Sequence, residues 1–428
     1  MRPLAVRRSS FSLFSKFIWT IAFALTFCLP ALSPKALAQN FQVLHAFTDG
    51  LDGDNPFAGV TVDRHGNVYG TTAYGGTSNQ GTVFKLAQGG SGWIFTPLYS
   101  FSGSNEGQVA LAPLTVGPDG TLYGTTSFGG TSGLGTVFNV RPPANLCRSF
   151  LCFWTGTVLH TFTGGSDGSE PGNGAVVFDQ AGNLYGTTVS GGSTNGGVLY
   201  ELTHSQNGWT ENIAYNMSAG TTGIMPYGGV IFDSAGNLYG TAVEGGGGSG
   251  AVYELMPSGS GFTGRSIYAF PPGQPDDGSS PYGGVILDTA GNLYGVAFYG
   301  GPNGAGVVYQ LSPSGGGWIE NVLFAFGENN SGPAHGYPLA MDSEGNLYGT
   351  TFQGGTSQHG NVFRLSSSNG QWVFTDLHDF TGRADGGFPL GGVAIDASGN
   401  LYGTTEIGGS FGGNCSDLGC GVVWEITP

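Results

Sequence analysis

The sequence predicts an all-β fold, a seven-bladed β-propeller with four-stranded blades in which an N-terminal strand completes the last blade. Three observations lead to this prediction. One short phrase recurs seven times, each copy contains strand-like runs in the same order, and the run that the last copy lacks is found near the N-terminus. Many short strands in an even repeat are typical of propellers.

The recurring phrase is Gly-Asn-Leu-Tyr-Gly or a close variant, and it sets the period of the chain. Its tyrosines are Tyr69, Tyr123, Tyr185, Tyr239, Tyr294, Tyr348 and Tyr402. They are spaced by 54, 62, 54, 55, 54 and 54 residues. So regular a period indicates repeats that share one core, and we therefore expect residues 39–428 to form a single domain.

The fourth copy shows the strand-like runs most clearly. They cover residues 229–233, 237–242, 251–255 and 265–270, and we name them a, b, c and d. Their Val, Ile, Tyr and Phe residues favour strands. The segment 233–236 (Asp-Ser-Ala-Gly) between a and b is typical of a tight turn, because Asp binds the turn backbone and Gly allows positive φ.

Two further patterns recur within the copies. A glycine lies in the middle of each run b: Gly70, Gly124, Gly186, Gly240, Gly295, Gly349 and Gly403. Glycine weakens a strand, so we expect it to leave room for an aromatic ring from a neighbouring blade. A large aromatic residue lies eight positions before the end of run d: Trp93, Trp154, Trp209, Phe262, Trp318 and Trp372. Its recurrence predicts packing between blades.

The two ends of the repeat region predict how the ring closes. An apolar residue followed shortly by Phe or Met marks run d, at Leu98/Phe101, Leu159/Phe162, Ile213/Met217, Ile267/Phe270, Leu323/Phe326 and Leu377/Phe380. The last copy ends at run c, residues 422–426, and residues 42–47 supply the missing run d. This pairing would close the ring and remove exposed sheet edges.

The first 38 residues are typical of a secretory signal. Basic residues precede an apolar stretch of 13 residues, 17–29, and Ala36-Leu37-Ala38 fits a cleavage site. The stretch is too short for a transmembrane helix, and no later apolar run is long enough to span a membrane. We expect cleavage after Ala38 and export to the periplasm or the extracellular medium.

The composition is glycine-rich and acidic. The chain holds 82 Gly in 428 residues and carries a formal net charge of -16. Five basic residues and no acid precede residue 39, so the remainder carries a net charge of -21. Such a surface repels phosphate backbones and anionic membranes. We therefore expect no nucleic-acid partner, and we expect a monomer.

Four cysteines follow the expected signal: Cys147, Cys152, Cys415 and Cys420. An even count in an exported protein indicates disulfides. The first two lie in a c–d loop and the last two in a b–c loop, which a propeller places on opposite faces. The sequence therefore predicts two local disulfides, Cys147–Cys152 and Cys415–Cys420.

The copies resemble the GloVer tandem-repeat family of exported bacterial proteins. Residues 183–188 (Asn-Leu-Tyr-Gly-Thr-Thr), then Gly191-Gly192 and residues 197–202 carry the resemblance, which extends over residues 41–428. It implies a β-propeller-like repeat in an exported protein and supplies no catalytic residues. Family members often end in a sorting signal, a feature that we do not find before Pro428, so the resemblance gives no expectation of surface anchoring.

A variable position on the loop-rich face supplies the candidate ligand residues. In a four-stranded meander, the b–c loops and the d–a connectors share one face. The residue before each Gly-Gly of the b–c loop varies between copies: Tyr74, Phe128, Ser190, Glu244, Tyr299, Gln353 and Ile407. Variable loops on a rigid scaffold often bind ligands. We select Tyr74, Phe128, Glu244, Tyr299 and Gln353 as candidates, with shielding of neighbouring loops as the alternative.

The d–a connectors hold recurring acids that are candidates for cation binding: Asp52, Asp167, Asp277 and Asp385. If carboxylates from several blades converged on the central channel, they would suit a hard cation such as Ca²⁺. A structural role in Asp-Gly turns is the alternative. We expect no other cofactor. Residues His45, His160 and His378 occupy one position of run d and are expected to lie apart from one another.

These features favour a non-catalytic, exported binding scaffold that takes a glycan, peptide or protein ligand on its b–c loop face. No Gly-x-Ser-x-Gly elbow and no metal-ligand spacing is present in the sequence, so we assign no catalytic residue. Two alternatives stay open. One is a hydrolase or lyase that acts on polysaccharide or a small molecule at the channel mouth, and the other is a structural envelope protein.

Overall fold

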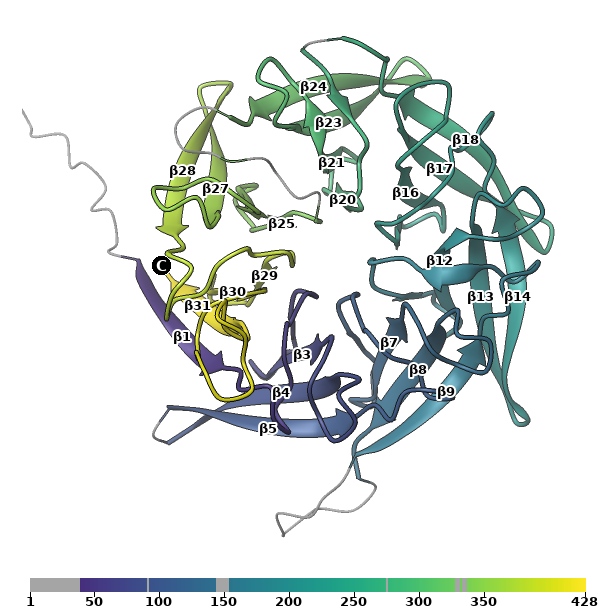
Figure 1. Cartoon of the computed structure of the whole chain (residues 1–428). Helices are drawn as coiled ribbons and strands as arrows, with labels where there is room; N and C mark the ends of the chain where they lie inside the picture. Colours follow the sequence, from purple (N-terminus) through teal and green to yellow (C-terminus); the bar gives the residue numbers. More distant parts are fainter. Residues whose placement is uncertain (1–38, 91, 144–153, 275, 328–331, 333–336) are drawn as a thin grey trace, which may run out of the picture. The chain divides into compact units, whose positions relative to one another are not determined.

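The computed structural model describes residues 39–90, 92–143, 154–274, 276–327, 332 and 337–428. Across these residues the chain forms strands and turns and no helix. Seven antiparallel sheets surround a central axis, as Figure 1 shows. The predicted seven-bladed β-propeller is therefore confirmed.

Each blade runs from a short inner strand a to a long outer strand d (Figure 1). Blades one to three are β2 (Thr61–Val62), β3 (Val68–Thr72), β4 (Thr82–Gly89) and β5 (Gly92–Ser100); β6 (Thr115–Val116), β7 (Leu122–Thr126), β8 (Thr136–Arg141) and β9 (Thr155–Thr161); and β11 (Val177–Phe178), β12 (Leu184–Ser190), β13 (Val198–Ser205) and β14 (Gly208–Asn216), with β10 (Ser169–Pro171) added beside β12.

Blades four to six continue the pattern. They are β15 (Val230–Phe232), β16 (Leu238–Ala242), β17 (Ala251–Ser258) and β18 (Gly261–Ala269); β20 (Ile286–Leu287), β21 (Leu293–Ala297), β23 (Val307–Ser314) and β24 (Gly317–Ala325); and β25 (Ala340–Met341), β26 (Leu347–Thr351), β27 (Asn361–Ser368) and β28 (Gln371–Asp379). A separate two-stranded ladder joins β19 (Gly278–Ser279) to β22 (Tyr299–Gly300).

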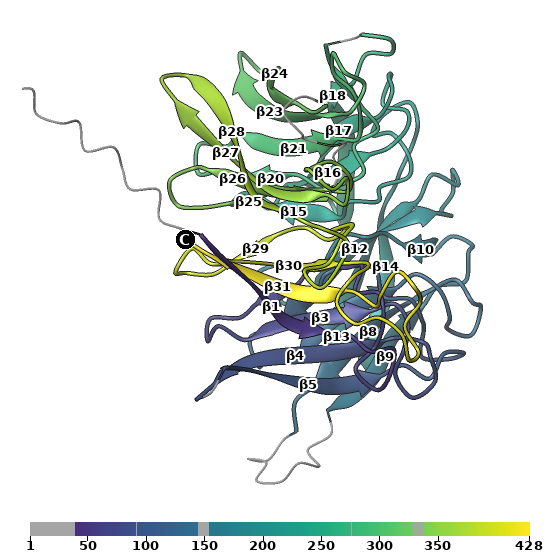
Figure 2. The same cartoon turned by 60° about the vertical axis from the view of Figure 1, so that its left-hand side comes forward.

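The seventh blade combines the two ends of the repeat region, as predicted. Its strands are β29 (Ala394–Ile395), β30 (Leu401–Thr405), β31 (Val422–Thr427) and β1 (Asn40–Ala46). Strand β1 pairs antiparallel with β31, with Phe41 opposite Ile426 and Val43 opposite Trp424. Figure 2 shows β1 lying along β31. The N-terminal strand thus gives the last blade its outer strand and closes the ring.

The glycine in each strand b lies opposite an aromatic residue of strand c in the same blade. A Cβ added at Gly70 would lie 2.4 Å from the ring of Phe84, its direct cross-strand partner. The same pairing recurs between Gly403 and Trp424. The expectation of a ring from a neighbouring blade is therefore wrong, because the strand register brings the ring over the glycine within one sheet.

The recurring aromatic residue of strand d packs between blades, as predicted. The strand-b tyrosine of one blade meets the aromatic residue of the next blade at centroid distances of 6.0 to 6.5 Å in Tyr69–Trp154, Tyr123–Trp209, Tyr185–Phe262, Tyr239–Trp318 and Tyr402–Trp93. Trp372 joins the hydrophobic cluster that contains Tyr294. The Tyr402–Trp93 pair joins the seventh blade to the first, so the same contact continues across the closure.

A second contact between blades differs from one interface to the next. One side chain of each outer strand packs on a residue of the following outer strand. His45 stacks on Phe95 at 3.8 Å, and His378 stacks on Phe41 at 3.7 Å. Where the first residue is Tyr99, its ring covers Gly156, so that a Cβ added there would lie 2.4 Å from it. Large residues thus face small ones or stack, and each interface has its own matched pair.

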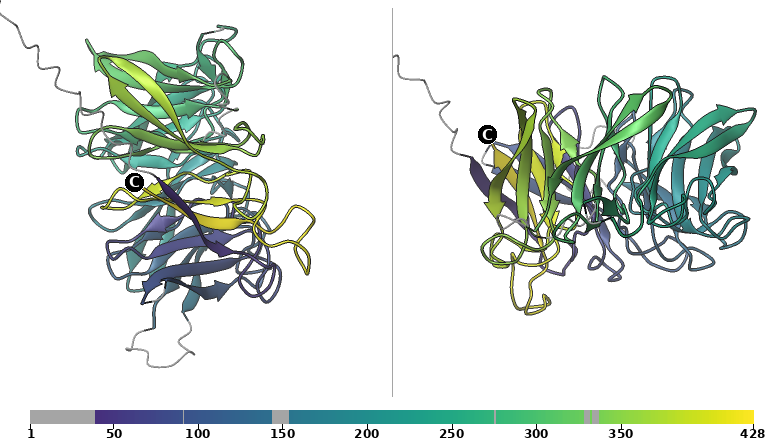
Figure 3. Two further views of the ribbon diagram at one scale, coloured as in Figure 1. Left: turned by 90° about the vertical axis from the view of Figure 1, so that its left-hand side faces the viewer. Right: turned by 90° about the horizontal axis from the view of Figure 1, so that it is seen from above.

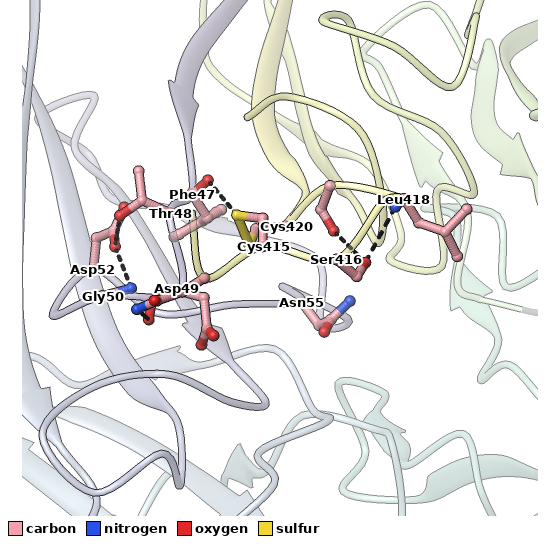
Figure 4. Close-up of a disulfide and its surroundings, with 12 residues drawn as sticks. Phe47, Thr48, Asp49, Gly50, Asp52, Asn55, Cys415, Ser416, Leu418 and Cys420 are labelled. Atoms are coloured by element: carbon pink, nitrogen blue, oxygen red, sulfur yellow. Dashed lines mark hydrogen bonds between the residues drawn. A yellow bond between two sulfur atoms is a disulfide. The ribbon is translucent and has the colours of Figure 1, made fainter. Parts of the chain in front are cut away.

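The b–c loop of blade seven is stapled at the closure. Cys415 and Cys420 form the predicted disulfide, with Cα atoms 5.3 Å apart. The backbone N–H of Asn55 donates to the carbonyl of Cys420 at 3.1 Å, and Figure 4 shows the disulfide against residues 47–55. The loop therefore holds the connector that joins β1 to blade one. The predicted Cys147–Cys152 pair lies outside the described residues.

Removal of the closing strand should destabilise the whole ring. A chain that starts at Thr48 loses the β1–β31 pairing and the fully buried Phe47, and burying one Phe side chain in a core is worth about 3–5 kcal/mol. We predict a fall in Tm of more than about 5 °C and self-association through the exposed β31 edge. Scanning calorimetry and gel filtration measure both.

The control for this deletion is a chain that starts at Gln39 and keeps β1. Its Tm should match that of the full chain, and a synthetic peptide of residues 39–47 should restore Tm to the shorter chain. Equal Tm values for the two truncated chains would show that β1 is not needed to close the ring.

The stapled loop supports a second prediction. Closing a loop this short contributes about 2 kcal/mol to the free energy of unfolding, which is about 2–3 °C in Tm for a chain of this size. The double variant C415S/C420S should show that loss under non-reducing conditions. The reductant that lowers the Tm of the wild type should leave the Tm of the variant unchanged, and a wild-type Tm that is insensitive to reductant would contradict the prediction.

Candidate functional site

The b–c loops and the d–a connectors lie on the same face of the ring, as predicted. Isolated antiparallel bridges join Asp54 to Tyr74, Gln108 to Phe128, Ile224 to Glu244 and Gly387 to Ile407. The ladders Ser169–Ser190 and Ser279–Tyr299 repeat the pairing in blades three and five. The backbone of each variable position is thus fixed while its side chain differs. Figure 3 shows this face edge-on, with the stapled loop in yellow extending beyond it.

One cavity of about 260 Å³ opens at the inner rim of this face. It is lined by Asn173, Gly228, Tyr282, Gly283, Phe298, Tyr299, Tyr337 and Pro338. Most of these residues directly precede the inner strands of blades three to six. A Cβ added at Gly228 would lie 2.2 Å from the backbone nitrogen of Gly284, so glycine is required where blades four and five approach. The cavity is therefore built by connectors that converge near the axis.

Aromatic rings form a continuous row along the cavity. Tyr227 contacts Tyr282 at 5.4 Å between centroids, Tyr282 contacts Phe298 at 5.4 Å, and Phe298 contacts Tyr299 at 4.4 Å. Tyr299 is 52% exposed at the open end of the row. Because the rings support one another edge to face, the row presents a pre-formed apolar surface with hydroxyl groups at its edges.

Acidic residues lie beside this row and keep its phenols protonated. Burial raises the pKa of Tyr282 above its usual value, and the nearby Tyr299 and Glu244 raise it further. Burial also raises the pKa of Tyr227, to which Tyr282, Glu170 and Glu244 add. The tyrosine hydroxyls are therefore hydrogen-bond donors at neutral pH, next to carboxylates that accept.

The structure brings only part of the predicted ligand set together. Tyr299 lines the cavity, and Glu244 lies close enough to influence its tyrosines. Tyr74 and Phe128 belong to blades one and two and are 42% and 43% exposed outside it, and Gln353 is exposed on blade six. Whether these three bind a ligand stays a prediction.

Sequence reasoning missed the aromatic residues that precede the inner strands. Tyr227, Tyr282 and Tyr337 occupy equivalent positions in the connectors to blades four, five and six, and they follow one another at intervals of 55 residues. This interval equals the repeat period. A search for aromatic residues at a constant position in the connectors would have found them.

The four acids selected for cation binding do not converge on the channel. Each lies beside a side chain of the preceding outer strand: Asp52 beside His45 at 3.0 Å, Asp167 beside His160 at 3.4 Å, Asp277 beside Tyr268 at 2.5 Å and Asp385 beside His378 at 3.2 Å. The expected convergence is wrong, because each carboxylate binds back to its own repeat. The described residues hold no group of three or more His, Cys, Asp or Glu side chains placed to bind a metal. Binding of Ca²⁺ stays a prediction.

Two glutamates of the outer strands carry strongly raised pKa values. Burial, with a smaller effect of Asp167, raises the pKa of Glu211 in β14 to about 7. Burial and Asp277 raise the pKa of Glu320 in β24 to about 7. Each leaves its Oε1 buried without a hydrogen-bond partner. Both sites therefore favour a protonated carboxyl group.

These glutamates predict a pH effect of defined sign. Because their folded-state pKa lies above the usual 4.5, the neutral carboxyl contributes stability below pH 4.5 that is lost as the pH rises through about 7. The variants E211Q and E320Q stay neutral at all pH values. We predict that their Tm relative to wild type increases from pH 5 to pH 8, as calorimetry would measure.

The matched control is E344Q, which neutralises an exposed glutamate in an a–b turn. Its Tm difference from the wild type should stay constant over the same pH range. A constant difference for E211Q and E320Q as well would show that these carboxyl groups are ionised in the folded protein.

The described part of the chain offers no helix with the length and apolar character that a membrane span requires.

Comparisons with known proteins agree with the repeat and the fold. The profile of the Gloeobacter/Verrucomicrobia repeat matches residues 32–156 and 153–338. No curated protein matches the sequence significantly.

Similar solved structures share the fold at low sequence identity. An ancestral GH74 enzyme is 13% identical with a TM-score of 0.54, over 87% of this chain and 48% of that chain. The extracellular domain of a one-component system from B. thetaiotaomicron is 13% identical with a TM-score of 0.53, over 90% of this chain and 40% of that chain. The PQQ-bound aldose sugar dehydrogenase from Streptomyces coelicolor is 13% identical with a TM-score of 0.44, over 91% and 98%. This chain thus spans less than half of the first two proteins, and identities this low show the fold alone.

Proposed function

The chain belongs to the Gloeobacter/Verrucomicrobia repeat family, and on this premise we propose that it is an exported, non-catalytic scaffold that binds a saccharide ring in the aromatic cavity of its loop face. Export is supported by the N-terminal sequence and by the Cys415–Cys420 disulfide. The observation that carries the proposal is the row of rings along the cavity.

The chemistry of the cavity suits a sugar. A pyranose ring presents a flat patch of C–H groups on one face and hydroxyl groups around its edge. The rings of Tyr282, Phe298 and Tyr299 offer apolar surfaces, and tyrosine hydroxyls, carboxylates and the backbone beside Gly283 offer hydrogen-bond partners around them. A few polar groups in an apolar, pre-formed pocket are typical of small-molecule sites.

Size and charge narrow the ligand class. The cavity of about 260 Å³ lies just below the usual lower limit of about 300 Å³ for ligand pockets, so it suits one or two sugar rings. The chain after residue 38 carries a net charge of -21, and Glu170 and Glu244 lie near the cavity. Neutral sugars are therefore favoured over uronic acids and sugar phosphates.

The test is titration calorimetry with a panel of neutral monosaccharides and disaccharides. For any sugar that binds, Y299A should weaken binding about tenfold, because one aromatic contact is worth about 0.5–1.5 kcal/mol. Y282F keeps the ring and removes one hydroxyl, and it should weaken binding less. The matched control is Y74A, the same change at the equivalent position of blade one, outside the cavity.

Three results would contradict the proposal. No binding across the panel would reject the ligand class, and equal losses for Y299A and Y74A would reject the cavity. Release of new reducing ends from an oligosaccharide, abolished by Y299A, would instead support the enzyme alternative.

A further inference from the structure

We infer that the opposite face of the ring carries a second class of site, a groove repeated at blade interfaces that binds neutral oligosaccharides and makes the protein multivalent. Cavities of about 570, 780 and 620 Å³ lie at the interfaces of blades three and four, four and five, and seven and one. All three open on the face of the a–b turns and c–d hairpins, away from the aromatic cavity. The inference therefore stands beside the proposed function and does not depend on it.

The three grooves are built from the same parts. Each is walled by the a–b turns of two adjacent blades and by the c–d hairpin, or the strand end beside it, of the second blade. The strand-b tyrosine of the first blade forms the floor: Tyr185, Tyr239 or Tyr402. The aromatic residue of the second blade lies beside it: Phe262, Trp318 or Trp93. Each groove therefore has an aromatic floor between polar turns.

One position of strand c separates these interfaces from the others. The residue opposite the strand-b tyrosine is Glu201, Glu254 or Glu425 in the three blades that begin a groove. In the other blades it is Lys85, Asn139, Gln310 or Arg364. Each glutamate accepts a hydrogen bond from its tyrosine, at 2.7, 3.0 and 2.9 Å. A tyrosine–glutamate pair at the floor thus marks every groove.

The groove of blades three and four leaves its glutamate most available. Glu254 is also paired with Arg265, and Glu425 also accepts from Trp93. Glu201 lines its groove, and Tyr185 donates to its Oε1. The walls contain Phe178 and Phe232 as well as Phe262. This groove therefore combines aromatic surfaces with a carboxylate that can accept a ligand hydroxyl.

The charges of the three grooves point to a neutral ligand. The turn carboxylates are occupied, since Asp179 accepts from Ala181 N, Asn183 N and Asn183 Nδ2. The groove of blades four and five adds Arg265, and that of blades seven and one adds Arg64 and His65. A ligand that fits all three must tolerate this change of sign. Neutral oligosaccharides do so, and volumes above 500 Å³ accommodate several rings.

The test blocks one groove from its exposed rim. Ser260 lies on the c–d hairpin of blade four and is exposed at the edge of the groove of blades three and four, so S260W should fill it without disturbing the core. The matched control is Q206W, on the exposed c–d hairpin of blade three, which lines none of the three grooves. All variants carry Y299A, so that the aromatic cavity does not contribute.

Native mass spectrometry with cellohexaose, maltohexaose and xylohexaose counts the bound ligands. We expect up to three per Y299A chain for at least one oligosaccharide, one fewer with S260W, and no change with Q206W. E201Q keeps the side-chain size and removes the charge, and it should weaken the site about tenfold.

Two outcomes would overturn the inference. One is a Y299A chain that binds no hexasaccharide; if the wild type still binds one sugar, the proposed function stands and only the grooves fail. The other is an equal effect of S260W and Q206W on the number of bound ligands. Binding of Lys- or Arg-rich peptides in place of all three oligosaccharides would assign the grooves to cationic ligands and also reject the inference.

Discussion

The pairing of β1 with β31 is the contact on which the rest of the structure depends. Each blade buries its strand-b tyrosine against the next blade, so no blade has a complete core by itself. In an open arc, Tyr402 and Trp93 would lose each other, and aromatic residues of this size bury about 150–250 Å² each. At about 25 cal/mol per Å², the loss would be several kcal/mol, in addition to an exposed sheet edge.

The closure also fixes which blade follows which. The tyrosine contact is nearly the same at every interface and would tolerate a shifted order. The contact between outer strands is not, because a Tyr99 ring over Gly156 and a His378 ring on Phe41 are not interchangeable. Phe41 belongs to β1, so the closing strand carries its own matched residue. We infer that invariant contacts supply stability and variable contacts supply the order of the ring.

The repeat could be predicted from the sequence because its determinants are local and periodic. Strand residues, turn aspartates and the missing outer strand of the last copy all have a fixed place in the period, and so do Cys415 and Cys420. The partner of Gly70 could not be predicted in the same way, because it depends on the strand register, which brings Phe84 over it. The same sequence is compatible with a ring from either side.

The candidate site was less predictable because it depends on how far each loop extends toward the axis. Tyr74, Phe128 and Tyr299 share a position in the repeat, yet only Tyr299 lines the cavity, since the connectors of blades three to six converge there. The acids of the connectors were expected at the channel. They lie instead beside His45, Tyr268 and equivalent residues, because a side chain seven residues earlier in the same blade is within reach.

Hydrogen–deuterium exchange of the intact chain tests the central claim most directly. The amides of residues 40–46 and 422–427 lie in a ladder between two outer positions of a closed blade. If the ring is closed as described, they exchange as slowly as the amides of β4 and β5 in blade one. Exchange within seconds in both segments, with blade one still protected, would show an unpaired edge and contradict the closed ring.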